Sequence, residues 1–246
     1  MEIVNVRASS VTGDLCREYF RDKYPKVILN LGNSDNQCIP LDIDRSLVVN
    51  KPGSVAMCSN KTLSLKVLSE AGVNVPELVN ADIDIVVHVK DEPRPIRVSL
   101  IERFPDGIEY ATRFVDKVKE WRVLMFFGKP FRFFEKIPKT ECFNWDHDGA
   151  DFKWKPLKTM PTGLSEICEK AATTLEIDLA GIDVGMTEDG TFYVFEVNSA
   201  PGMNEDTLKW LDYRLEKKYG DANMADDPDD ITRQDCDICP HCGRSL

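Results

Sequence analysis

Two acidic side chains and one amide occupy positions at which a β-hairpin would bring them together. In the segment GIDVGMTEDGTFYVFEVNSAPG, the Asp189-Gly190 pair is a strong signal for a two-residue hairpin turn. Counting back from that turn places Asp183 directly opposite Glu196, and strand alternation puts Asn198 on the same face as Glu196. The opposite, core-directed face is predicted to carry four apolar side chains: Val184, Met186, Phe195 and Val197.

Two carboxylates and an amide on one face form a set of oxygen ligands. Directly opposed Cβ atoms lie about 5 Å apart in an antiparallel sheet, and like charges at that distance destabilise the sheet unless a cation lies between them. Mg²⁺ fits this demand best, because it takes few protein ligands together with phosphate oxygens. Asp183, Glu196 and Asn198 are therefore the candidate magnesium ligands. The alternative is an exposed hairpin with two solvated acids.

The elements around this hairpin alternate between short apolar strands and amphipathic helices, which predicts a mixed α/β fold. Strands are expected at residues 27–31, 47–49, 83–89 and 96–104, with a further hairpin over 120–137. Helices are expected within 59–76, over 164–175 and around 208–215. Residues 140–160 show no period and are expected to form a loop, and the acidic residues 221–235 are expected to form a flexible linker.

The central hairpin adds cationic side chains. If its turn lies at Gly128-Lys129, Arg122 stands opposite Glu135, and Lys136 falls on the other face. Under this register, Lys136 reaches the face of Arg122 only with a bulge or a longer turn.

Three stretches of the chain resemble parts of the ATP-grasp ligases, a family that includes glutathione synthetases, D-alanine–D-alanine ligases and ribosomal-protein glutamate ligases. Asp183, Glu196-x-Asn198 and the Ala-Pro-Gly-Met at 200–203 are similar to the family's metal-binding end. Residues 60–76 are similar to its helix leading into the ATP-clasping lid, and the stretch that contains Arg122 and Lys136 is similar to its central hairpin. The stretches lie in the family's order within about residues 47–205, which makes the combination more specific than any one of them.

The resemblance implies an ATP-grasp fold in which nucleotide is held between a small lid subdomain and a C-terminal subdomain containing the β-hairpin. The expected division is an N-terminal segment 1–55, a lid 56–115, a C-terminal subdomain 116–220 with the metal site, and an acidic linker with a cysteine-rich tail at 221–246. The implied activity is that of a Mg-ATP-dependent ligase. ATP would phosphorylate a carboxylate to an acyl phosphate, which an amine of an amino acid or peptide would then attack.

The resemblance also implies roles for single residues. Arg122 and Lys136 would act on the transferring phosphoryl group as catalytic residues. The adenine would lie against the strand-end linker 111–115, and cationic groups of the lid helix and lid strand would contact the nucleotide. The predicted nucleotide-binding residues are Lys61, Lys90, Ala111, Phe114 and Val115. For Phe114, ordinary core packing is an equally good interpretation.

One segment departs from the family's pattern. Where the family has a glycine-rich loop over the phosphates, this chain has Asp-Glu-Pro-Arg-Pro at 91–95, with no glycine and two prolines that cannot donate a hydrogen bond. Two alternatives therefore stay open: an ATP-binding module without turnover, and a phosphotransferase on the same fold.

Charge and hydropathy exclude some classes of function. The formal charge of −11 argues against a duplex nucleic-acid binder and against docking on an anionic membrane. No stretch approaches the roughly 20 apolar residues of a membrane span, and the N-terminus lacks the layout of a signal peptide. Scattered cysteines are typical of free thiols in a reducing compartment, so a cytoplasmic location is expected.

The last residues form a separate cysteine-rich motif. Cys236, Cys239, His241 and Cys242 resemble one knuckle of a zinc ribbon, and they offer four candidate ligands for zinc. Free thiols and an iron–sulfur cluster are the alternative interpretations. A protein partner or a second copy of the chain could dock through this tail.

Overall fold

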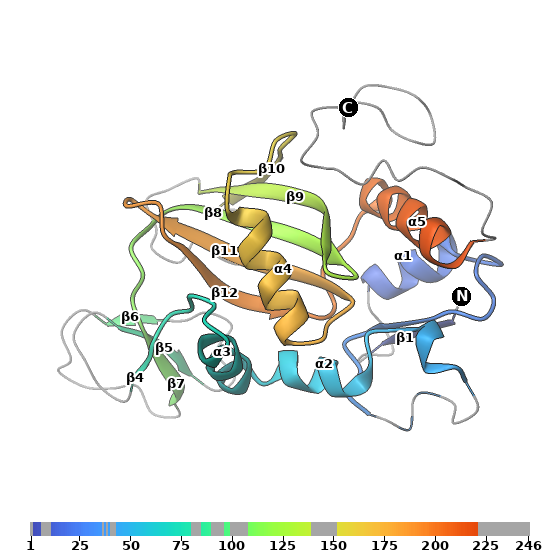
Figure 1. The fold of residues 1–246 in the computed structure, drawn as a ribbon, viewed down its shortest axis with the longest axis horizontal. Helices are drawn as coiled ribbons and strands as arrows, with labels where there is room; N and C mark the ends of the chain where they lie inside the picture. The colour runs from blue at the N-terminus through green and yellow to red at the C-terminus, as the bar shows by residue number, and fades with distance from the viewer. Residues whose placement is uncertain are drawn as a thin grey trace.

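The computed structural model describes residues 2–5, 11–35, 37, 39, 43–79, 85–89, 96–98, 108–138 and 152–220. A five-stranded antiparallel sheet forms its centre, and one helix crosses a face of that sheet (Figure 1). In spatial order the strands are β10 (Phe152–Pro156), β9 (Lys129–Pro138), β8 (Lys117–Phe126), β11 (Leu179–Thr187) and β12 (Phe192–Asn198). The crossing helix is α4 (Leu164–Thr174).

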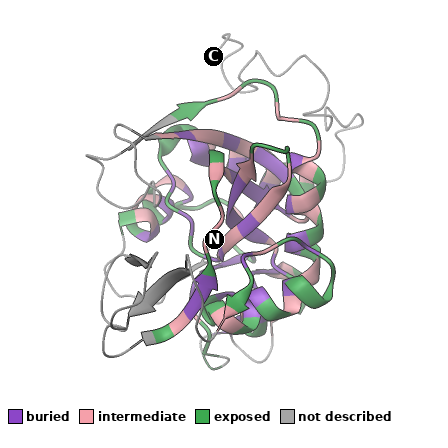
Figure 2. Ribbon diagram, turned by 90° about the vertical axis from the view of Figure 1, so that its left-hand side faces the viewer, coloured by how far each residue is buried: buried purple, intermediate pink, exposed green. Residues whose placement is uncertain are grey.

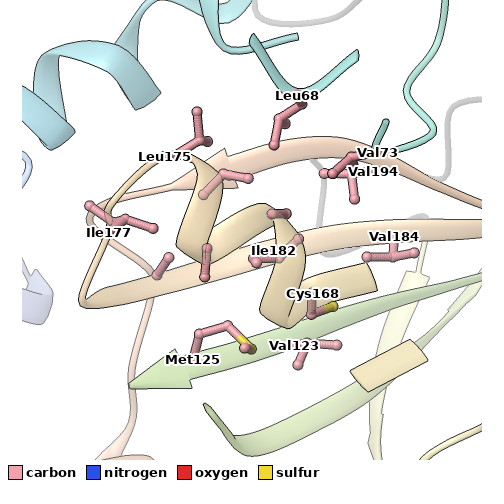
Figure 3. Packing of buried hydrophobic residues seen from close by; sticks show 14 of the residues in the cluster. Leu68, Val73, Val123, Met125, Cys168, Leu175, Ile177, Ile182, Val184 and Val194 are labelled. Atoms are coloured by element: carbon pink, nitrogen blue, oxygen red, sulfur yellow. The ribbon is translucent and has the colours of Figure 1, made fainter. Parts of the chain in front are cut away.

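The main core lies between α4 and this sheet. Leu164, Cys168 and Ala171 recur at helical spacing and are fully buried, so one stripe of α4 faces the strands. Figure 3 shows Cys168 and Leu175 lying over Val123, Ile182 and other apolar side chains of the strands. Each such side chain contributes about 1.5–3 kcal/mol through burial of its apolar surface.

Two further helices complete this core. They are α2 (Pro52–Ser59) and α3 (Lys61–Glu70), and Val55, Cys58 and Leu68 add to the same apolar cluster. Asn60 is the N-cap of α3, and its side-chain oxygen accepts a hydrogen bond from Leu63 N at 3.1 Å. Gly72 follows α3 with a φ of +74°, the left-handed conformation that glycine often adopts just after a helix.

Among the described residues, those that pack over the other face of the central sheet gather at one end of it. There α1 (Val11–Tyr19), α5 (Glu205–Tyr219) and a small parallel sheet pack over apolar side chains of β8, β9 and β11 (Figure 1). The small sheet has the order β1 (Glu2–Asn5), β2 (Ile28–Leu31) and β3 (Val48–Val49). Burial follows this arrangement: buried residues (purple in Figure 2) lie along the inner strands, and exposed residues (green) predominate on the outer surfaces of the helices.

A second antiparallel sheet precedes the central one in the chain. Its order is β4 (Leu78–Val79), β7 (Ile108–Arg113), β5 (Ile85–Val89) and β6 (Ile96–Val98). Residues 114–116 connect β7 directly to β8 of the central sheet. The predicted boundary between lid and C-terminal subdomain therefore falls in the connection between the two sheets.

Buried Asn50 ties the small parallel sheet to the central one. Its side-chain Nδ2 donates to the carbonyl oxygens of Leu179 at 2.8 Å and Ser199 at 3.1 Å, and its Oδ1 accepts from Leu179 N at 2.7 Å. The main-chain N–H of Asn50 donates to Asp178 Oδ2 at 3.1 Å. These bonds fix the start of β11 and the residue after β12, which are the two ends of the hairpin that carries the acidic residues.

Some elements differ from expectation. The sequence did not predict α1 or α2, whose short apolar stripes are interrupted by Gly13 and Gly53. Residues 140–160 were expected to form a loop, but 152–156 form strand β10 on the edge of the central sheet, paired with β9. The linker 221–235 lies outside the described residues. None of the helices within the described ranges is long and apolar enough to cross a membrane.

Candidate nucleotide and metal site

The face of the central sheet opposite α4 carries a row of charged side chains from neighbouring strands. Arg122 on β8, Asp183 on β11 and Glu196 on β12 are direct cross-strand partners. Their chain neighbours Ile182, Val184 and Val197 enter the main core, so alternation directs the charged row away from α4. The predicted juxtaposition of Asp183 with Glu196 is therefore present.

Asp183 is engaged by Arg122 in a two-point ion pair. Arg122 Nε donates to Asp183 Oδ1 at 2.7 Å, and the terminal guanidinium nitrogen donates to Oδ2 at 2.6 Å. Burial lowers the pKa of Arg122, but the Asp183 charge and hydrogen bonds, together with Glu196 and Glu120, raise it above its ordinary value. The sequence interpretation that Arg122 pairs with Glu135 is wrong, because Glu135 lies opposite Trp121 on the other face of the sheet.

Glu196 and Asn198 also have protein partners. Lys61 Nζ, at the start of α3, lies 3.4 Å from Glu196 Oε1. Burial raises the pKa of Tyr110 on β7, and the negative charges of Glu196 and Glu109 raise it further. Asn198 Oδ1 accepts a hydrogen bond from Ala200 N at 2.9 Å.

A bulge, rather than the predicted turn, sets the position of Glu196. Thr187 N and Gly190 N close a longer turn than the two-residue one expected at Asp189-Gly190. The additional residue in this turn would shift the register by one, so that Asp183 would not lie opposite Glu196. A bulge in β12, with Phe195 as the extra residue between Val194 and Glu196, restores the pairing. The core prediction for Phe195 is therefore wrong, since its ring lies over Gly185 instead, where an added Cβ would meet Phe195 Cε2 at 2.4 Å.

A second bulge decides the face of Lys136. The hairpin turn is centred on Phe127 and Gly128, with φ of +45° and +75°, not on Gly128-Lys129. Phe131 is an extra residue in β9, after which Arg122 pairs with Phe134. Lys136 therefore shares the face of Arg122, which is the bulged case left open by the sequence.

Lys136 pairs with Glu120, which also pairs with Lys117, and sequence reasoning singled out neither Glu120 nor Lys117 as a site residue. Lys136 Nζ lies 2.9 Å from Glu120 Oε1, and Glu120 Oε2 lies 2.5 Å from Lys117 Nζ. Strand alternation places Glu120, two residues before Arg122, on the face of Arg122, so it could have been found from the sequence. The same alternation places Lys117 on the opposite face. A third bulge, with Val118 as the extra residue, directs Lys117 to the face of Arg122.

The predicted adenine-binding residues lie at the junction of the two sheets. Ala111 is buried in β7, while Phe114 and Val115 are half-buried in the connection to β8. The nucleotide-binding role of these residues stays a prediction, and Lys90 lies outside the described residues.

The ligand set fits a metal that takes few protein ligands. Within the described ranges, no place gathers three or more His, Cys, Asp or Glu side chains that could hold a metal. A cation at the hairpin would rest on two carboxylates and the Asn198 amide, which are hard oxygen donors of the kind Mg²⁺ takes when phosphate supplies the remaining ligands. Cys236, Cys239, His241 and Cys242 lie outside the described residues, so their zinc binding stays a prediction that metal analysis with and without residues 236–246 would check.

Comparison with known proteins gives a result for structure only. No protein-family model matches the sequence, and no curated protein matches it. The D-alanine–D-alanine ligase from Bacillus anthracis complexed with ATP is similar at a TM-score of 0.62, with 16% identity over 89% of this chain and 92% of that one. The L-amino acid ligase from Bacillus licheniformis gives 0.55, with 16% identity over 77% and 52% of the two chains. The ATP-grasp ligase PsnB with minimal precursor, Mg and ADP gives 0.51, with 18% identity over 64% and 55%.

The fold is that of the ATP-grasp ligases. The chain spans about half the length of the PsnB and L-amino acid ligase structures. The four-stranded sheet lies within residues 56–115, for which the lid assignment stays a prediction.

Proposed function

We propose that the chain is a Mg-ATP-dependent ligase that joins a carboxylate to the amine of an amino acid or peptide through an acyl phosphate. The row Arg122–Asp183–Glu196 across three strands of an ATP-grasp fold carries this proposal. It places two carboxylates and a guanidinium where a metal and phosphate groups could be held together.

In the proposed reaction, a carboxylate oxygen of the substrate attacks the γ-phosphorus of ATP, and the bond to the bridging oxygen of ADP breaks. An amine then attacks the acyl carbon, phosphate leaves, and the amine loses a proton. Asp183, Glu196 and Asn198 would hold Mg²⁺, which would neutralise charge on the phosphate oxygens. Arg122 and Lys136 would donate hydrogen bonds to the transferring phosphoryl group, and Lys61 would leave Glu196 for the nucleotide.

ADP release measured with pools of amino acids and peptides tests the proposal. Release that depends on both a carboxylate and an amine supports ligation. Release with the phosphoryl group remaining on an acceptor would identify a phosphotransferase. Thermal stabilisation by Mg-ATP without ADP release would identify a binding module.

Substitution of a candidate ligand gives an independent test. Glu196→Gln is expected to weaken binding of Mg-ATP by about tenfold or more, because it removes a charged metal ligand. Glu188→Gln is the matched control, since Glu188 lies exposed near the turn of the same hairpin. Equal affinities of the Glu196 variant and the wild type would refute the assignment.

A further inference from the structure

Glu120 is a buried carboxylate held between two lysines. Its exposed fraction is 4%, and that of Lys136 is also 4%. The Lys117 side chain is 10% exposed, and its ammonium group lies 4.8 Å from the centre of the Phe195 ring. All three charges lie on the same face of the sheet as Arg122 and Asp183.

Burying these three charges has a desolvation cost that offsets much of their mutual attraction. Removing an ammonium or a carboxylate from water costs several kcal/mol per ion, and apolar residues of similar volume would often stabilise the protein more. A lysine side chain also has about 2 kcal/mol of rotamer entropy to lose when it is held in one place. Because the contacts of the cluster are offset by desolvation and lost entropy, holding the ammonium groups of Lys117 and Lys136 in place contributes little net stability, which points to a role other than stabilisation.

The same strands provide an internal comparison. Glu135, one residue before Lys136, also lies between two lysines, but on the other face of the sheet. Glu135 Oε1 lies 3.8 Å from Lys119 Nζ, and Glu135 Oε2 lies 3.9 Å from Lys155 Nζ. The Glu135 side chain is 18% exposed. The tight, buried version of this arrangement thus occurs only on the face of the candidate site, among the residues described.

We infer that Glu120 is a positioning residue, which holds the ammonium groups of Lys136 and Lys117 in place to receive the phosphates of the nucleotide. The inference rests on the proposed ATP site. Glu120 itself would touch neither the phosphates nor the nucleoside, and its effect would pass through the lysines. Its removal should therefore affect phosphate-bearing ligands and leave adenosine binding unchanged.

Calorimetric titration with Mg²⁺ and a non-hydrolysable ATP analogue, and separately with adenosine, tests this. Glu120→Gln is expected to weaken the ATP analogue by about tenfold, as expected for loss of charge-assisted hydrogen bonds, and adenosine by less than about twofold. Glu120→Asp should restore part of the affinity, and Glu135→Gln should match the wild type. Lys136→Met should weaken the analogue similarly, and adding Glu120→Gln to it should cost much less than in the wild type.

The outcomes separate the two proposals. No binding of the analogue by the wild type refutes the ATP site itself. Binding by the wild type and equally by Glu120→Gln refutes only the positioning role. Equal losses for adenosine and the analogue refute it too, because Glu120 would then act on the nucleoside. If thermal melting shows Glu120→Gln to be unfolded, the Glu120→Gln/Lys136→Met variant, which removes the buried pair together, is compared with Lys136→Met.

Discussion

Every predicted magnesium ligand already has a protein partner. Arg122 holds both oxygens of Asp183, Lys61 lies beside Glu196, and the main chain donates to Asn198. A metal entering alone must displace these cations, whereas a metal entering with nucleotide brings phosphates that can take them over. We therefore expect the proposed site to bind metal and nucleotide jointly rather than metal alone.

Arg122→Gln is expected to change the affinity for Mg²⁺ alone and the affinity for the Mg²⁺-bound ATP analogue in opposite directions. Mg²⁺ alone should bind about tenfold more tightly, because Arg122 no longer competes with it for the oxygens of Asp183. Hydrogen bonds to a charged group contribute about 1.5–3 kcal/mol. The Mg²⁺-bound ATP analogue should bind more weakly, because the guanidinium is lost from the phosphates. Calorimetry of both titrations in one buffer measures this. Lys129→Gln is the control, since Lys129 pairs with Glu169 away from the site. A change of both affinities in the same direction would contradict the account.

At the scale of elements, the two hairpins position the candidate site, and Gly185 leaves room for the ring of Phe195. An added Cβ at Gly185 would lie 2.4 Å from Phe195 Cε2, whereas one at Gly53 in α2 would meet nothing within 4 Å. Gly185→Ala is expected to destabilise the protein by about 1–3 kcal/mol through overpacking. Gly53→Ala should be neutral or stabilising, because a helical glycine costs about 0.5–1 kcal/mol relative to alanine.

Urea unfolding of both variants measures this, and Phe195→Ala provides the cross-check. In that background the cost of Gly185→Ala should largely disappear, because the clashing ring is gone. A cost that persists undiminished would show that the backbone, not the ring, excludes a side chain at Gly185.

Sequence reasoning found the strands of the site but not the registers that align them. Asp183, Glu196 and Arg122 could be identified from residue types, alternation and family resemblance. The extra residues Val118, Phe131 and Phe195 could not, because a bulge is set by tertiary packing and leaves no turn signal. The cancelling effects of a longer turn and a bulge explain why the position of Glu196 was right while that of Phe195 was wrong.

At the scale of the molecule, Asn50 joins the N-terminal sheet to the hairpin. Asn50→Ala leaves several buried main-chain groups of β11 and Ser199 without partners, and is expected to cost about 3 kcal/mol or more. Asn60→Ala, which removes only the N-cap of α3, should cost about 1 kcal/mol. Denaturant unfolding compares them, and equal costs would contradict a joining role for Asn50.

The buried thiols make stability fall in alkaline solution. Burial raises the pKa of Cys16 and Cys58 from 9.0 to about 12. Because unfolding releases these protons more readily, the stabilisation is complete below pH 9.0 and is lost as the pH rises toward about 12. Iodoacetamide at pH 8 should leave both thiols unmodified in folded protein and alkylate them in guanidinium, as peptide mass spectrometry would show. Alkylation in folded protein would contradict their burial.

The three bulges have a consequence for how such a sequence can change over evolution. Side chains alternate with a period of two, so gaining or losing one residue between a turn and the site sends every later chemical group into the apolar core. We therefore expect a single-residue insertion or deletion in these two hairpins to be tolerated only when the gain or loss of a bulge compensates for it. Relatives whose hairpins differ by an odd number of residues should have gained or lost a bulge.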